Sequence, residues 1–178
     1  LVRSRWTDFE QNATLRSLAG GIHMMLNQYK EAADAYRDAA RIAPDDVLVQ
    51  YSLGTALSLA GAHGEAVTVL EAVAQDQSEV PASVLLALGR SQLARGRHEQ
   101  ARKSLLRATD AEPGNAAAWA LLARCGIAGN DLLLARRAAS RASQLTPQSA
   151  ETTLLFGYVC LLQRDQAAVR ELAREIHD

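Results

Sequence analysis

The sequence predicts an all-α protein built from repeated pairs of antiparallel helices. Its composition favours helices over strands, because only 4% of the 178 residues are aromatic and sheets draw on aromatic and β-branched residues. Small residues recur at a nearly constant interval, and proline or polar turn signals separate the units that this interval defines. With 48% hydrophobic and 22% charged residues, we expect the chain to bury a core and to stay soluble.

The repeat is visible in three columns of small residues. Within each column, successive members are 34, 35, 34 and 34 residues apart. Small side chains are needed where two helices cross with their backbones close together, since a Leu at that place would hold the helices apart. The columns are Gly20, Gly54, Gly89, Ala123 and Gly157; Ala32, Ala66, Ala101, Ala135 and Val169; and Ala39, Val73, Ala108, Ala142 and Ile176.

The elements follow in order from the N-terminus. Residues 1–12 place Val2, Trp6 and Phe9 on one helical stripe, so we expect a capping helix or the remnant of an upstream repeat there. Each later unit should hold two helices of about 13 residues joined by a short turn. The units are 13–46, 47–81, 82–115, 116–149 and 150–178.

Turn signals support these boundaries. Within the units, Gly61, Gly96 and Asn130 can adopt the left-handed backbone conformation that ends a helix. Between units, segments such as "EPGN" and "TPQS" stop one helix with a proline and begin the next with polar residues. Each unit is therefore read as a helix, a turn and a second helix.

This pattern resembles the tetratricopeptide repeat, whose 34-residue motif runs W, L-G, Y, A, F, A, P. The fourth unit carries Trp119, Leu122, Ala135, Ala142 and Pro147 at the expected places. The first carries Ala32, Tyr36, Ala39 and Pro44. The resemblance covers residues 13–178 and implies a right-handed superhelical solenoid with first helices on the concave face and second helices on the convex face.

The resemblance also implies a groove on the first helices that holds a peptide or helix of a partner. We expect this groove to be largely apolar, with Arg90 and Arg124 bonding to carbonyls or acidic side chains of the partner. The alternative is that these residues pack against a neighbouring repeat or a helix of the same protein. The expected contact residues are Tyr51, Thr55, Leu86, Arg90, Ala120, Arg124, Leu154 and Tyr158, and the same columns include Met25, Leu48, Leu161 and Leu162.

Positive charge gathers on the second helices of the third and fourth units. Phosphate or an acidic protein segment could dock on such a convex basic patch. The alternative is a solvated helix face with pairs such as Glu99 to Lys103. Nucleic acid is the weaker partner because no aromatic residues are interleaved for base stacking. The patch comprises Arg102, Lys103, Arg107, Arg136, Arg137 and Arg141.

Catalytic and metal-binding patterns are missing from the sequence. His63 and His98 occupy equivalent places beside a turn and are expected to pack there, and Cys125 and Cys160 are expected to be reduced, buried thiols. No phosphate loop, hydrolase motif or metalloprotease motif is found. We therefore expect no enzyme activity, no cofactor and no metal.

The function predicted is a protein interaction scaffold. One alternative is the regulatory or substrate-recruiting arm of a larger enzyme, such as a glycosyltransferase or a sulfotransferase. Another is a self-associating module in which acidic end units meet the basic middle of a second copy. No apolar run is long enough to cross a membrane, and a cytoplasmic location is the default expectation unless an N-terminal targeting segment was removed.

Overall fold

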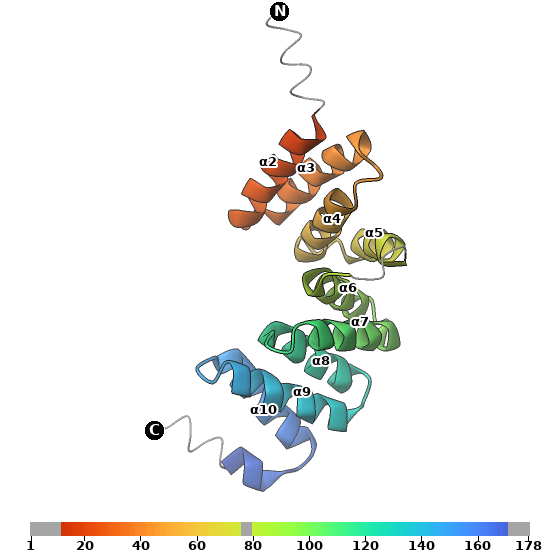
Figure 1. The fold of residues 1–178 in the computed structure, drawn as a ribbon. Coiled ribbons are helices and arrows are strands. Elements are labelled where there is room, and N and C mark those ends of the chain that lie inside the picture. The colour runs from red at the N-terminus through yellow and green to blue at the C-terminus, as the bar shows by residue number, and fades with distance from the viewer. Residues whose placement is uncertain (1–11, 76–79, 171–178) are drawn as a thin grey trace, which may run out of the picture. The chain divides into compact units, whose positions relative to one another are not determined.

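The computed structural model describes residues 12–75 and 80–170, and every regular element in these ranges is an α-helix (Figure 1). The predicted fold class, all-α with sequential antiparallel helix pairs, is confirmed for this part of the chain. The chain forms two compact units, residues 1–95 and 96–178, which we call the N-terminal unit and the C-terminal unit. The predicted helix at residues 1–11, the predicted end of the second unit at 76–79 and the predicted end of the fifth at 171–178 lie outside the described residues.

The N-terminal unit is made of two helix pairs and one further helix. Helix α2 packs against α3, and α4 packs against both α3 and α5. Helix α6 then packs against α4 and α5, as a first helix of the next repeat should. The bounds are α2 (Ala13–Met25), α3 (Tyr29–Ile42), α4 (Val47–Leu59), α5 (His63–Gln75) and α6 (Ala82–Ala94).

The C-terminal unit continues the same alternation. Helix α8 packs against α7 and α9, and α10 packs mainly against α9 and also touches α8. Residues 166–170 are also helical. The bounds are α7 (His98–Ala111), α8 (Ala116–Ala128), α9 (Leu132–Leu145) and α10 (Ala150–Leu162).

The small-residue columns lie where paired helices touch. A Cβ atom added to Gly20 would lie 2.8 Å from the ring of Tyr36, and one added to Gly54 would overlap the side chain of Leu70. Gly89, Ala123 and Gly157 are buried as well. The second column is fully buried at Ala32, Ala66, Ala101 and Ala135. The prediction that small residues permit close helix crossing is confirmed for these positions.

The five turns inside the repeats share one backbone feature. Each places its second residue at a positive φ, and Gly61, Gly96 and Asn130 were expected to do so. Asn27 and Arg164 adopt the same conformation, with φ values of 58° and 57°. The first helices α2, α4 and α8 are each capped at their N-terminus by the preceding residue. The side chains of Asn12, Asp46 and Asn115 accept hydrogen bonds there from backbone N–H groups of the helix.

Adjacent glycines in α2 allow a matched test of the close crossing. Gly20→Ala is expected to lower the free energy of unfolding by about 1–3 kcal/mol, because the new methyl group overlaps the buried ring of Tyr36. Gly21→Ala is expected to be neutral or stabilising by up to about 1 kcal/mol, because its methyl would lie 3.6 Å from the Tyr36 hydroxyl, an ordinary contact. Urea unfolding measures both, and equal effects would contradict the close crossing.

The turn conformation gives a second matched pair. Neither Gly61 nor Gly114 has an atom near enough to clash with an added Cβ, but only Gly61 has a positive φ, at 82°. Gly61→Ala should therefore cost about 1 kcal/mol through the backbone alone. Gly114→Ala should change stability by less than about 0.5 kcal/mol. Thermal and urea unfolding of both variants check this difference, and a neutral Gly61→Ala would show that the turn relaxes.

Candidate functional site

Four of the predicted groove residues lie in the N-terminal unit, on α4 and α6, which pack against each other. Thr55, Leu86 and Arg90 are partly exposed, and the described part of the chain gives Arg90 no ionic partner. Tyr51 was expected to contact a partner in the groove, but in the structure it is buried and only 7% exposed. Burial raises the pKa of Tyr51, and its hydroxyl has no hydrogen-bond partner among the described residues. Because so little of Tyr51 is exposed, it can make only a small contact with a partner.

The other four predicted groove residues lie in the C-terminal unit. Ala120 and Arg124 are on α8, Leu154 and Tyr158 are on α10, and the two helices touch. The exposed fractions of Leu154 and Tyr158 are 66% and 51%, and Arg124 is exposed without an ionic partner in the described residues. Leu161 and Leu162 extend the exposed apolar stripe along α10. The structure thus places one free cation beside a row of exposed apolar side chains.

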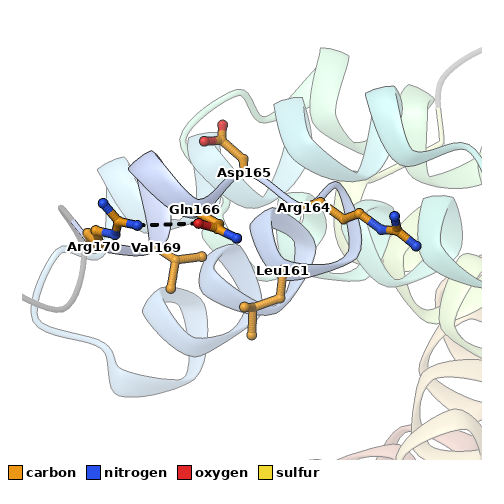
Figure 2. A pocket seen from close by; sticks show the side chains of 6 residues that line it. All are labelled: Leu161, Arg164, Asp165, Gln166, Val169 and Arg170. Carbon is orange, nitrogen blue, oxygen red and sulfur yellow. Dashed lines mark hydrogen bonds between the residues drawn. The ribbon is translucent and has the colours of Figure 1, made fainter.

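A shallow hollow of about 200 Å³ adjoins this stripe at the end of α10 (Figure 2). Leu161 and Val169 point to the same side, whereas Asp165 points away from both. Arg170 donates a hydrogen bond to Gln166 at 3.3 Å across the rim. Sequence reasoning placed Leu161 in the groove but did not predict the hollow, because it depends on how the residues after the turn fold back. Its lining residues are Leu161, Arg164, Asp165, Gln166, Val169 and Arg170.

The six residues of the predicted convex basic patch divide into two groups. Arg102 pairs with Glu99 at 2.9 Å, and Arg136 pairs with Asp165 at 2.8 Å. Glu99 therefore pairs with Arg102, three residues later, and not with Lys103 as the sequence suggested. The other four are exposed and have no ionic partner in the parts of the chain that the structure describes: Lys103, Arg107, Arg137 and Arg141.

Asp165 is held by several donors at the turn after α10. The hydrogen bond from the backbone N–H of Ala168, followed by the hydrogen bond and charge of the Arg136 guanidinium, lowers the pKa of the Asp165 carboxyl. Arg136 also donates a hydrogen bond to the Gln163 side chain at 3.0 Å, and Gln163 donates to the carbonyl of Leu132 at 2.8 Å. Arg136 is thereby committed to joining the turn to α9, which leaves it less free for a partner than its neighbour Arg137.

The two cysteines are packed in the protein interior rather than placed in an accessible site. Cys125 and Cys160 are buried free thiols, and the Cys125 thiol donates a hydrogen bond to the carbonyl of His98 at 3.3 Å. Burial raises the pKa of both thiols. In residues 12–75 and 80–170, no group of three or more His, Cys, Asp or Glu side chains could hold a metal ion. None of the described helices is long and apolar enough to span a membrane.

Comparison with known families decides the classification. Two family models described as tetratricopeptide repeat match the sequence, one over residues 57–125 and the other over residues 3–47 and 18–81. The chain belongs to the tetratricopeptide repeat family. No curated protein matches the sequence. As a tetratricopeptide repeat protein, the chain is a module of a class that acts in protein interactions.

Solved structures share this tetratricopeptide repeat fold. MamA from Desulfovibrio magneticus RS-1 is 21% identical with a TM-score of 0.80, covering 93% of each chain. PilW, a type IV pilus biogenesis factor, is 18% identical with a TM-score of 0.82, covering 98% of this chain and 81% of PilW. YrrB is 14% identical with a TM-score of 0.75, covering 97% of this chain and 89% of YrrB. At these identities the similarity establishes the fold alone.

The buried thiols predict low chemical reactivity. A thiol with a raised pKa carries less thiolate at a given pH, and burial blocks access of a reagent. Cys125 and Cys160 should therefore react with iodoacetamide at pH 7.5 at least about tenfold more slowly in the native protein than in urea. Mass spectrometry of peptides containing each cysteine measures the two rates separately. A native rate equal to the unfolded rate at either position would show that this thiol is accessible.

Proposed function

We propose that this chain is a non-enzymatic scaffold that binds a peptide or helix of a partner protein on its first helices. The observation that carries the proposal is the exposed apolar stripe of α10 beside the free Arg124 of α8. A contiguous row of exposed apolar side chains marks a surface that binds another molecule, whereas single exposed apolar residues are common on any protein surface. We define the first-helix face as the four predicted groove residues of the C-terminal unit, on α8 and α10, together with Leu161 and Leu162 of α10.

The stripe on α10 is separate from the side of that helix that forms the core. Leu154, Tyr158 and Leu161 are four and three residues apart, which places them on one side of a helix. The opposite side carries Val159 and Cys160, which are fully buried. The exposed stripe is therefore not needed to hold the described helices together, and this supports a role in binding.

The chemistry of the first-helix face favours an amphipathic segment. Leu154, Tyr158 and Leu161 would contact apolar residues of the partner, and Arg124 would bond to its carbonyl or carboxylate oxygens. Arg124 lies 34 residues before Tyr158, so the repeat places the two at equivalent positions on α8 and α10. Affinity would come from the apolar contacts, and the arginine would select the register of the partner.

The N-terminal unit carries the equivalent positions Thr55, Leu86 and Arg90. Arg90 repeats the place of Arg124 one unit earlier, again without an ionic partner in the described ranges. YrrB, described as a tetratricopeptide repeat protein with an unusual peptide-binding site, supports peptide binding by this fold. Binding of a protein or peptide partner and the default cytoplasmic location stay predictions.

Peptides selected from a random phage-displayed library against the full chain test this function. Selected peptides should lose at least about tenfold in affinity for Leu154→Ser/Tyr158→Ser and for Arg90→Glu/Arg124→Glu, because these changes remove apolar contact and the anchoring charges. Ile42→Ser is the matched control, since Ile42 is 44% exposed but lies on the second helix α3 and in neither binding face. Its affinity should change less than about twofold.

Fluorescence anisotropy measures these affinities, and far-UV circular dichroism checks that each variant folds. Peptides that bind all the first-helix variants as tightly as the parent chain would remove this face as the binding site.

A further inference from the structure

The four unpaired cations of the second helices occupy two repeated positions. Lys103 and Arg107 lie four residues apart on α7, and Arg137 and Arg141 repeat them 34 residues later on α9. Residues four apart lie on the same side of a helix, so each helix presents two like charges that repel each other. All four are exposed. This arrangement adds nothing to helix stability and needs another explanation.

The same two positions in the first repeat carry the opposite charge. Asp34 and Asp38 on α3 lie 69 residues before Lys103 and Arg107, which is one 34-residue and one 35-residue offset. Both acids are neutralised within the N-terminal unit, Asp34 by Arg37 and Asp38 by Arg41 at 3.0 Å. On α3 the charges at these positions are therefore balanced by neighbours on the same helix, whereas the four cations of α7 and α9 have no ionic partner in the described residues.

Two exposed leucines lie among these cations. Leu106 on α7 is 37% exposed and follows Lys103 by three residues, and Leu133 on α9 precedes Arg137 by four. Both spacings place the leucine on the same side of its helix as the cations. We define the cationic face as Lys103, Leu106 and Arg107 of α7 with Leu133, Arg137 and Arg141 of α9.

The two halves of the cationic face are close enough for one ligand. Helices α7 and α9 both pack against α8, and packed helix axes are about 8–10 Å apart. The axes of α7 and α9 therefore lie within about 20 Å of each other, and a peptide helix of about 18 residues is some 27 Å long. A single helical segment can reach both pairs of cations.

We propose that the cationic face binds an acidic amphipathic segment of a partner protein. Its carboxylates would pair with the four cations, and its apolar residues would cover Leu106 and Leu133. A nucleic acid backbone would satisfy the charges but not the leucines, and neither α7 nor α9 contains a Phe, Tyr or Trp on which a base could stack. The face is independent of the first-helix face, so the chain can hold two segments.

The test uses the full chain and a fluorescein-labelled helical peptide of about 18 residues with Glu four apart and Leu along one side. A peptide with Lys in place of every Glu and one with Ser in place of every Leu are the references. The Glu and Leu peptide should bind saturably, at least about tenfold more tightly than the Lys peptide and several-fold more tightly than the Ser peptide. Its affinity should fall as salt rises.

Charge-reversed variants locate the binding. Lys103→Glu/Arg107→Glu and Arg137→Glu/Arg141→Glu should each weaken the Glu and Leu peptide at least about tenfold, and Leu133→Ser should weaken it several-fold. Lys30→Glu/Arg95→Glu makes the same change in net charge at two exposed cations that lie outside both faces, and it should change affinity less than about twofold. Circular dichroism and the urea midpoint establish that all variants fold.

Three outcomes would overturn the proposal: no saturable binding of the Glu and Leu peptide up to about 0.5 mM, an equal loss in the Lys30→Glu/Arg95→Glu variant, or tighter binding of duplex DNA or phosphatidylserine vesicles than of the peptide. Failure here is separable from failure of the proposed function. Phage-selected peptides respond to Leu154→Ser/Tyr158→Ser, whereas the acidic peptide responds to Leu133→Ser.

Discussion

Close approach of paired helices is the constraint on which the rest of this structure depends. Glycines and alanines occupy the crossing points, and at Gly126 of α8 the nearest atoms of the partner helix belong to its backbone. A Cβ atom there would lie 2.7 Å from the backbone nitrogen of Ala135 and 2.9 Å from the carbonyl oxygen of Asp131. Backbone atoms cannot move aside as a side chain can, so only glycine permits α8 and α9 to pack at this distance. The pairing of α8 and α9 then fixes which sides of both helices face outward.

Exposure of the two candidate binding faces follows from that pairing. Once the small-residue side of a helix is committed to its partner, the remaining sides are left for solvent or for another protein. On α10 the outward side is apolar, while on α9 it is cationic with one exposed leucine, Leu133. The same packing rule therefore yields surfaces of different chemistry, because the outward positions are free of the constraint that fixes the inward ones.

Much of the fold could be predicted from the sequence, because steric requirements at the crossings and turns restrict residue type strongly. The columns of Gly20 and Ala32 and the turn at Gly61 are examples. Side-chain pairing was harder to predict, since Arg136 is neutralised by Asp165, 29 residues later, and Arg137 beside it is not. The burial of Tyr51 depends on neighbouring helices. Arg164 has a positive φ, which is uncommon for arginine, so this conformation is indicated only by the position of Arg164 in the repeat.

A chain of hydroxyl groups joins α4 to α6 inside the N-terminal unit. Ser91 and Ser58 are 2.8 Å apart and hydrogen bonded, and the Ser58 hydroxyl donates in turn to the carbonyl of Ala87 at 3.0 Å. All of these groups are buried, so separating the two helices would strip several polar atoms of partners at once. The first helix of the third repeat is thus tied to the second repeat, so the two helices open together as one cooperative block rather than one at a time.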